Sequence, residues 1–261
     1  MGRVQMGFVK TQEEIDHYFS LGVRQFPDSE MLGMMYQTDP EAIKRLLPPP
    51  LEPAAEPWAL TYFCQFKDTN LGPGYRETAL FIRCQYKGEV GNYCLSMPLD
   101  GHDDRVFNGR EIYGFPKKTA SITLKRDGKI AEGWVERRGV KFAHVKAELM
   151  TKMDQPPLKT GPSFLFKFLP RADLKPGFAG KVELVRQRTE IAYKCFEMGS
   201  GSIEFQDSPF DPWSEVPCKS VIGCYYFTGD TTMLPGDVVG EADPDAFLPY
   251  SFSRTDWGYE K

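Results

Sequence analysis

The sequence predicts an α+β fold that is mainly antiparallel β-sheet, arranged as a barrel or sandwich with a few helices. From Trp58 onward, short segments rich in aromatic and β-branched residues alternate with turns rich in Gly and Asp, which is typical of strands. Only two segments, both near the N-terminus, have the pattern of a helix. Many short strands with few helices indicate a barrel or a sandwich. A chain of 261 residues that is 41% hydrophobic can bury the core of such a domain.

The two predicted helices lie at residues 11–20 and 38–47. In the first, TQEEIDHYFS, Thr11 can cap the helix and Glu14 follows three residues later, which is the pattern of a capping box. The second, TDPEAIKRLL, is supported by Thr38 or Asp39 as the cap, Pro40 in the first turn, and an apolar face of Ile43, Leu46 and Leu47. The proline-rich run at 48–53 ends this helix.

Strands are expected over the rest of the chain. The segments with strand patterns are 58–66, 78–86, 91–99, 164–170, 181–193, 201–206 and 220–234, and a run at 121–149 in which Asp127-Gly128 and Gly139 mark two hairpin turns. A Pro-rich stretch at 155–163 divides the chain, but neither side has an obvious core of its own. We therefore expect this stretch to join two parts of one sheet within a single domain spanning 1–261.

Composition and charge exclude several classes of function. The net charge is −4, and Lys and Arg are spread along the chain, which argues against nucleic-acid binding. No run approaches about 18 apolar residues, so we expect no membrane span. The N-terminus lacks the apolar region of a secretory signal, so we expect a cytoplasmic protein. The six cysteines form no C-x-x-C pair and the three histidines are far apart. We therefore expect reduced, buried thiols and no zinc site.

Residues 109–120, GREIYGFPKKTA, contain two adjacent lysines in a chain that is not basic. The simplest interpretation is a solvated pair that serves only solubility. The local sequence favours a different one, because Lys117 and Lys118 follow an apolar Tyr-Gly-Phe and a backbone-fixing proline, and Gly109 and Gly114 bracket the segment. Glycines in those places suit a close approach to a cavity wall.

A buried lysine can carry chemistry that a solvated one cannot. Its neutral amine attacks a ketone and forms an imine, which accepts the electron pair of an adjacent breaking bond. Burial can lower the pKa of a lysine by up to about 3–5, whereas a like charge roughly 10 Å away contributes only about 1.7 kcal/mol at an effective dielectric constant of about 20. Adjacent strand residues point to opposite faces, so only one lysine can face a pocket. We assign that place to Lys117, with Lys118 secondary.

The segment 109–120 closely resembles the active-site segment of the acetoacetate decarboxylase family, which has Gly-Arg-Glu, a short spacer, and an aromatic residue before Pro-Lys-Lys. Further similarity at 36–53, 161–170 and 199–239 extends the resemblance over about 28–240, whereas 1–25 and 241–261 are less typical extensions. The resemblance implies a closed or cone-shaped β-barrel-like sheet with flanking helices, and a homo-oligomer. It implies no metal or organic cofactor, because the imine itself is the electron sink.

The resemblance also assigns catalytic roles. It implies that Lys117 forms the Schiff base beside Lys118, and that Glu77, in Tyr75-Arg76-Glu77, matches the glutamate that the family keeps before a central strand. A carboxyl group near an imine can transfer protons to and from the reacting atoms. Without the resemblance, Glu77 would be interpreted as a solvated loop residue beside Arg76.

Two positions depart from the family pattern. Ser29 stands where the decarboxylases have an arginine, and Tyr62 matches a second family glutamate when one residue is gapped. Loss of an acid and a base together is expected if the two groups paired, since either one alone would remain an unpaired charge. This loss weakens the case for acetoacetate as the substrate. Imine chemistry is unaffected, and superfamily members with aldolase–dehydratase activity are known.

Several other residues are candidates for the site. Tyr62 and Tyr113 can supply a phenolic proton donor, and Tyr113, four residues before Lys117, would share its face on an extended segment; a half-buried aromatic is the alternative for each. The candidates for the substrate carboxylate are Arg110, Arg83 and Arg76, and those for an apolar wall are Met97 and Phe115.

The sequence thus predicts a Schiff-base-forming lyase that acts on small keto acids. The reaction is either aldol addition and dehydration of pyruvate with an aldehyde, or decarboxylation of acetoacetate or another β-keto acid. The rival from another class is a non-catalytic β-barrel that binds a small hydrophobic ligand and keeps the lysines as remnants.

Overall fold

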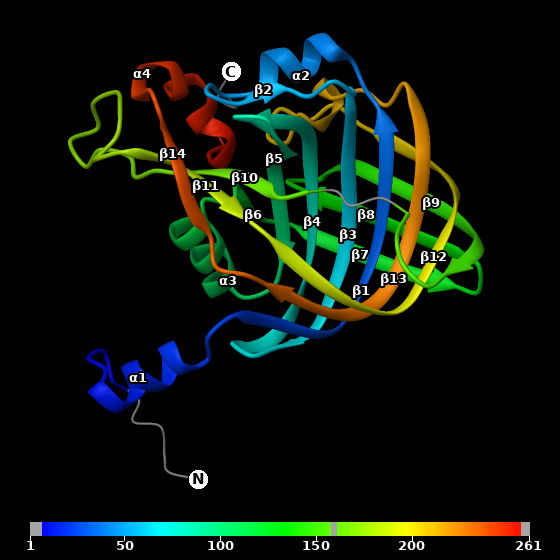
Figure 1. Ribbon diagram of the computed structural model, residues 1–261, viewed down its shortest axis with the longest axis horizontal. Coiled ribbons are helices and arrows are strands. Elements are labelled where there is room, and N and C mark those ends of the chain that lie inside the picture. Colours follow the sequence, from blue (N-terminus) through cyan, green and yellow to red (C-terminus); the bar gives the residue numbers. More distant parts are fainter. Residues whose placement is uncertain (1–6, 158–160, 257–261) are drawn as a thin grey trace.

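The chain folds around one large sheet with few helices (Figure 1). The structure, a computed structural model, describes residues 7–157 and 161–256. The strands are β1 (Arg24–Gln37), β2 (Glu52–Pro53), β3 (Trp58–Thr69), β4 (Gly72–Tyr86), β5 (Glu89–Asp100), β6 (Lys117–Thr119), β7 (Ser121–Asp127), β8 (Ile130–Arg137), β9 (Val140–Met153), β10 (Ser163–Lys167), β11 (Val182–Gln187), β12 (Thr189–Phe205), β13 (Ser220–Met233) and β14 (Asp237–Ala242). The helices are α1 (Gln12–Ser20), α2 (Pro40–Leu46), α3 (Asp103–Phe107), η1 (Asn108–Tyr113), η2 (Trp213–Glu215), α4 (Pro244–Phe247) and η3 (Leu248–Arg254).

The strand order is β14-β11-β10-β5-β4-β3-β1-β13-β12-β9-β8-β7, with β2 beside β4 and β6 beside β5. Neighbouring strands are antiparallel except where β5 pairs with β10 and with β6. The mainly antiparallel α+β architecture is therefore confirmed. The sheet rolls so that β7 lies against β3, β4 and β5, but within the described part of the chain its end strands β14 and β7 do not pair. The closed barrel that we expected is therefore not confirmed.

Alternation along β4 explains how one sheet forms both a core and a cavity. Successive strand residues point to opposite faces. Leu80 and Ile82 enter the main hydrophobic core, which also contains residues of β8 and β9 from the facing layer. Ala79 and Phe81 point the other way and join a separate apolar cluster beside the cavity. Both faces of this central strand are thus buried, which is why its sequence is a nearly continuous apolar run.

Both predicted helices and both predicted hairpin turns are present. Thr11 and Glu14 form a capping box at α1, and Asp39 caps α2. Gly128 and Gly139 adopt positive φ between the paired strands β7, β8 and β9. Strands from both sides of the Pro-rich stretch belong to the same sheet, which supports the proposal of a single domain; residues 158–160 of the stretch lie outside the described residues.

Strand β1 is an element that the sequence did not predict. It lies between β3 and β13, although it contains Pro27, an Asp28 with positive φ, and Gly33. A bulge between Phe26 and Ser29 accommodates the first two. Gly33 is needed because a Cβ there would lie 2.0 Å from the ring of Tyr225. Tertiary packing thus overrides the weak strand signal of this segment.

The remaining expectations concern thiols and membranes. All six cysteines are free, and four are buried, whereas Cys195 and Cys218 are half-buried. Within residues 7–157 and 161–256, no helix has the length and apolar character needed to cross a membrane.

Candidate active site

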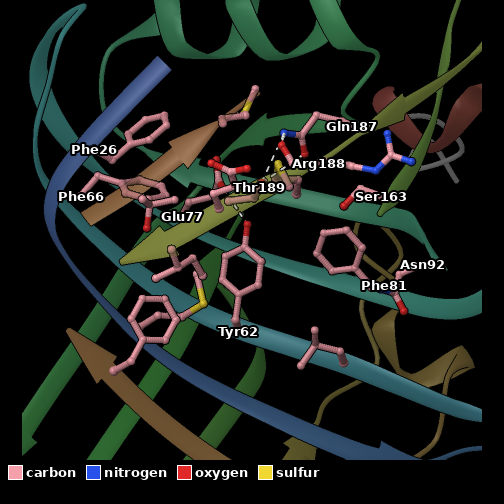
Figure 2. Close-up of a pocket in the computed structure, with 18 of the residues that line it drawn as sticks. Phe26, Tyr62, Phe66, Glu77, Phe81, Asn92, Ser163, Gln187, Arg188 and Thr189 are labelled. Carbon is pink, nitrogen blue, oxygen red and sulfur yellow. Dashed lines mark hydrogen bonds between the residues drawn. The ribbon is translucent and has the colours of Figure 1, made fainter. Parts of the chain in front are cut away.

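A cavity of about 810 Å³ lies against the face of strands β1, β3 and β4 that is opposite the main hydrophobic core (Figure 2). Its wall is largely apolar and includes Met35, Leu60, Phe81, Met97, Tyr113 and Phe115. Figure 2 shows Tyr62 and Phe81 side by side on this wall and Glu77 above the Tyr62 hydroxyl. A cavity of this size is typical of sites for small organic ligands.

Lys117 reaches this cavity from the short strand β6. Its neighbour across the parallel ladder is Met97 of β5, and its side chain is only 6% exposed. Nζ donates a hydrogen bond to Oε2 of Glu77 at 2.6 Å and lies 5.2 Å from the centre of the Tyr75 ring. The amine is thus held out of water beside one carboxyl group and one aromatic face.

Glu77 is a buried strand residue rather than a solvated loop residue. It lies on β4, is 6% exposed, and holds two donors, because its Oε1 accepts a hydrogen bond from the Tyr62 hydroxyl at 2.6 Å. Tyr62 opposes Ala79 in the ladder between β3 and β4, so it lies diagonally from Glu77 on the same face. Burial, and then the nearby Glu77 charge, raises the pKa of Tyr62 well above its usual value, so the phenol stays a donor.

Lys118 points away from the cavity, as expected for the next residue of a strand. Its Nζ donates to the carbonyl oxygen of Phe210 at 2.7 Å and lies 3.4 Å from a carboxylate oxygen of both Asp211 and Asp256. Its charge is therefore paired on the far side of β6. The catalytic role predicted for Lys118 remains a prediction, and its place in the fold indicates a structural contribution.

Tyr113 lines the cavity together with Phe115 and Met97, but the local geometry differs from our expectation. Residues 108–113 form a π-helix, and Gly114 ends it in the left-handed conformation with φ +95°. A Cβ on Gly114 would lie 2.5 Å from the carbonyl oxygen of Phe166. The extended segment that we expected between Tyr113 and Lys117 is therefore absent, and the two side chains share the cavity because the helix and turn bring them there.

Four of the predicted substrate-binding residues lie off the wall of this cavity in the described part of the chain. Ser29 is fully buried and donates to the Phe26 carbonyl oxygen at 2.8 Å. The other three are Arg110, which is half-buried, Arg83, which lies over the Trp58 ring and donates to Asn92, and Arg76, which bonds Gln65 and approaches Asp100. Arg76 points away from the cavity on β4. Arg83 is on the same side of β4 as Glu77 and Phe81, but it lies farther along the strand, where it covers Trp58 and binds Asn92.

Arg105 of α3 lines the cavity although the sequence did not single it out. It is 5% exposed, its Nη2 donates to the carbonyl oxygens of Leu71 and Pro73, and its Nη1 lies 3.1 Å from Asp104. Among the described residues its buried Nε has no hydrogen-bond partner. In the sequence Arg105 follows two aspartates, which is typical of a solvated, charged turn. Its burial distinguishes it from such a turn, and no pattern in the sequence predicts that burial.

Gly109 explains part of the Gly-Arg-Glu motif. A Cβ at this position would lie 2.4 Å from Cε and 2.5 Å from Cδ of Lys117. The glycine therefore leaves the passage through which the lysine side chain reaches Glu77. No metal site competes with this arrangement, since the described ranges contain no group of three His, Cys, Asp or Glu side chains arranged as ligands.

A family model described as acetoacetate decarboxylase matches residues 11–242. The chain belongs to the acetoacetate decarboxylase family. It is 32% identical over 229 residues to the acetoacetate decarboxylase of Burkholderia vietnamiensis, which covers 85% of this chain and 90% of that protein. As a member of this family it is a lyase.

Solved structures share the fold of this family member. The acetoacetate decarboxylase of Legionella pneumophila superposes with a TM-score of 0.76 at 27% identity, over 91% of this chain and 99% of that one. The enduracididine biosynthesis enzyme MppR, complexed with the condensation product of pyruvate and imidazole 4-carboxaldehyde, gives a TM-score of 0.72 at 20% identity, over 91% and 97%. At that identity MppR supports the fold alone.

Proposed function

We propose that this lyase acts on small keto acids and that Lys117 is its Schiff-base nucleophile. The observation that carries the proposal is the 2.6 Å contact between Lys117 Nζ and Glu77 Oε2, with both side chains 6% exposed at the wall of an apolar cavity. An amine must give up a proton to attack a carbonyl carbon. A carboxylate in direct contact provides the acceptor for the departing proton.

In the proposed first steps, a proton moves from Nζ to Glu77, and the amine attacks the keto carbon of the substrate. Glu77 returns the proton to the carbinolamine oxygen, and water leaves as the imine forms. Tyr62, bonded to the other oxygen of Glu77, fixes the direction in which the carboxyl group faces the reacting atoms. The protonated imine then accepts an electron pair from the neighbouring carbon.

Two reactions can follow. In decarboxylation the C–C bond to the carboxylate breaks, CO₂ leaves, and the electron pair forms an enamine, whose carbon then takes up a proton from water to restore the protonated imine. In aldol condensation the enamine arises by loss of a C–H proton to Glu77, attacks an aldehyde carbon, and the adduct loses water to give an enone. In both cases water hydrolyses the imine and restores the Lys117 amine.

The size of the cavity favours the reaction with two substrates. A cavity of about 150 Å³ can hold benzene, whereas this one has about 810 Å³. A keto acid of three or four carbons leaves most of that volume for an apolar aldehyde. The curated relatives are named acetoacetate decarboxylases, which favours decarboxylation. Because the two observations favour different reactions, both reactions are assayed.

Arg105 is the proposed partner of the substrate carboxylate. It contributes a buried guanidinium with an unpartnered Nε to the cavity wall. Its guanidinium carbon lies 5.9 Å from the centre of the Tyr75 ring, and the Lys117 amine lies 5.2 Å from the same ring. A guanidinium matches the planar geometry of a carboxylate.

Reductive trapping tests the proposal. Sodium borohydride is added with pyruvate or with acetoacetate, and intact mass and peptide mapping locate the adduct. We expect one stable adduct on Lys117, none in Lys117→Ala, and an unchanged adduct in Lys125→Ala, a lysine of β7 that does not line the cavity. No adduct with any keto acid would favour the non-catalytic binder of a hydrophobic ligand.

Two assays run in parallel separate the reactions. Release of CO₂ from acetoacetate measures decarboxylation, and an enone chromophore from pyruvate with an aromatic aldehyde measures aldol condensation. We expect the enone signal to be the larger. We further propose a homo-oligomer, from the family resemblance, and a cytoplasmic location, from the lack of an apolar signal region; light scattering of the purified protein and fractionation of cells would test them.

A further inference from the structure

The last described residues of the chain contact both ends of the segment that bears Lys117. Arg254, at the end of η3, donates from Nη2 to the carbonyl oxygen of Gly114 at 2.7 Å and to that of Phe166 at 2.5 Å. Gly114 lies three residues before Lys117. Two residues after Arg254, Asp256 lies 3.4 Å from the amine of Lys118. Residues 254–256 thus contact the segment 114–118 at both ends, through Gly114 and through Lys118.

Asp256 belongs to a partly buried network of charges. It accepts hydrogen bonds from Arg137 and Arg138, and Asp211, which is fully buried, pairs with Arg137 and with Lys118. Hydrogen bonding by Arg137 lowers the pKa of Asp256 far below its usual value, so the carboxylate stays charged at neutral pH. Breaking one member of such a network leaves the other charges uncompensated.

The segment that receives these contacts contains only a short strand. Strand β6 has three residues, paired with β5 alone. Residues 114–116 connect it to the π-helix through the left-handed turn at Gly114. A strand this short makes few ladder hydrogen bonds, so its position depends on the anchors at its two ends.

Arg254 is unusual because its charged guanidinium donates to two neutral carbonyl oxygens, those of Gly114 and Phe166. Its guanidinium also lies 4.1 Å from the centre of the Phe168 ring. Among residues 7–157 and 161–256, no carboxylate lies within ion-pair distance of it. Burial, and then the nearby Arg110, lowers the pKa of Arg254 to about 10, which leaves it charged at neutral pH. The hydrogen bonds to Gly114 and Phe166 offset part of the cost of burying this charge.

We propose that Arg254 and Asp256 are positioning residues that hold residues 114–118 so that the Lys117 amine stays within reach of Glu77. The inference rests on the function proposed for Lys117. It concerns a part of the chain beyond residue 242, where the match to the family model ends. The C-terminal segment would therefore be a support of the active site that lies outside the part of the chain matched by the family model.

The test uses Arg254→Gln and Asp256→Asn, with Arg254→Lys as the conservative variant. Arg126→Gln is the control, because Arg126 also donates to a carbonyl oxygen and covers an aromatic ring, but its contacts are to Gly128 and Tyr226 rather than to residues 114–118. The readouts are the rate of borohydride-trapped imine formation, kcat and KM for the keto acid, and the thermal unfolding midpoint.

We expect Arg254→Gln and Asp256→Asn to lower kcat and the trapping rate by about 10–100-fold with KM within about twofold, since a displacement of about 1 Å can cost a factor of about 100. Arg254→Lys should recover part of the loss, and Arg126→Gln should lower the unfolding midpoint without lowering kcat. The inference is overturned if the folded variants keep wild-type kcat, or if they lower only the unfolding midpoint, as we expect of Arg126→Gln. If Arg254→Gln does not fold, the kcat values of Arg254→Lys and Asp256→Asn decide whether the inference holds. Failure of the wild-type protein to form an adduct would instead overturn the proposed function.

Discussion

The amine of Lys117 and the carboxyl group of Glu77 meet across strand β5. Glu77 belongs to β4 and Lys117 to β6, and these two strands flank β5, where Leu99 opposes Glu77 and Met97 opposes Lys117. Two strand spacings separate their backbones by about 10 Å, and the two extended side chains reduce this to a 2.6 Å contact. The pair therefore exists only because both strands lie against the same central strand.

Glu77→Gln should separate binding from turnover. The amide keeps the shape of the carboxyl group but can no longer accept and return a proton, so we expect kcat to fall by about 10²–10⁴-fold. Glu190→Gln is the control, because Glu190 also lines the cavity but is exposed. Steady-state rates with the keto acid measure the effect, and equal losses in the two variants would contradict the role given to Glu77.

Tyr62→Phe should reduce activity by a smaller factor. The change removes the donor to Glu77 Oε1, and a hydrogen bond to a charged group contributes about 1.5–3 kcal/mol, so we expect kcat to fall about tenfold. Tyr36→Phe removes another buried phenol, which donates to the Val216 carbonyl oxygen, and should affect stability alone. A Tyr62→Phe protein with wild-type kcat would show that Glu77 needs no such support.

Gly109→Ala should displace the lysine without removing a functional group. The added methyl group would lie 2.4 Å from Cε of Lys117, so the amine must leave its contact with Glu77, and we expect kcat to fall at least about tenfold. Gly223→Ala is a matched control on the cavity wall, where the new methyl group meets only Met198 at 3.7 Å. Rates and a crystal structure of Gly109→Ala would check the displacement.

Arg105→Met should weaken binding of the keto acid. Loss of a charge-assisted contact worth about 1.5–3 kcal/mol corresponds to a rise in KM of about 10–100-fold. Arg76→Met removes an arginine that does not line the cavity and should leave KM unchanged. The dependence of rate on keto-acid concentration gives KM for both variants. An unchanged KM for Arg105→Met would show that Arg105 does not bind the substrate.

Stability should decrease in alkali because of buried acidic groups. Burial, and then Glu77, raises the pKa of the Cys64 and Cys94 thiols well above the usual value. The unfolded chain releases these protons first, near about pH 8.5. The free energy of unfolding therefore falls as pH rises above that point, by about 1.4 kcal/mol per pH unit for each thiol. We expect the fall to steepen above about pH 10, where the buried Tyr62 and Tyr75 follow.

The thiol contribution can be isolated with Cys64→Ala combined with Cys94→Ala. Thermal unfolding is measured between pH 7.5 and pH 10 for both proteins. The double variant should be less stable at pH 7.5, because it loses buried volume, but its stability should fall less steeply with pH. Parallel curves for the two proteins would show that these thiols are not the titrating groups.

The sequence by itself determined the fold class, both N-terminal helices and the two hairpin turns. It also predicted the chemistry of the site: the local pattern at 109–120 indicated a buried Lys117, whereas Glu77 was indicated by the family resemblance alone. These features depend on caps, turns and strand alternation, which act over a few residues. For the same reason the sequence correctly separated the directions of Lys117 and Lys118.

Only the tertiary structure decided which arginine lines the cavity, how Tyr113 reaches it, and that Tyr62 bonds Glu77. It also revealed strand β1 and the contact of Arg254 with Gly114. These facts depend on strand register and on the roll of one sheet, which bring together residues as far apart as Asp28 and Asp230, 202 positions. Long-range packing of this kind leaves no periodic trace in the sequence, because burial and pairing are set by partners from distant parts of the chain.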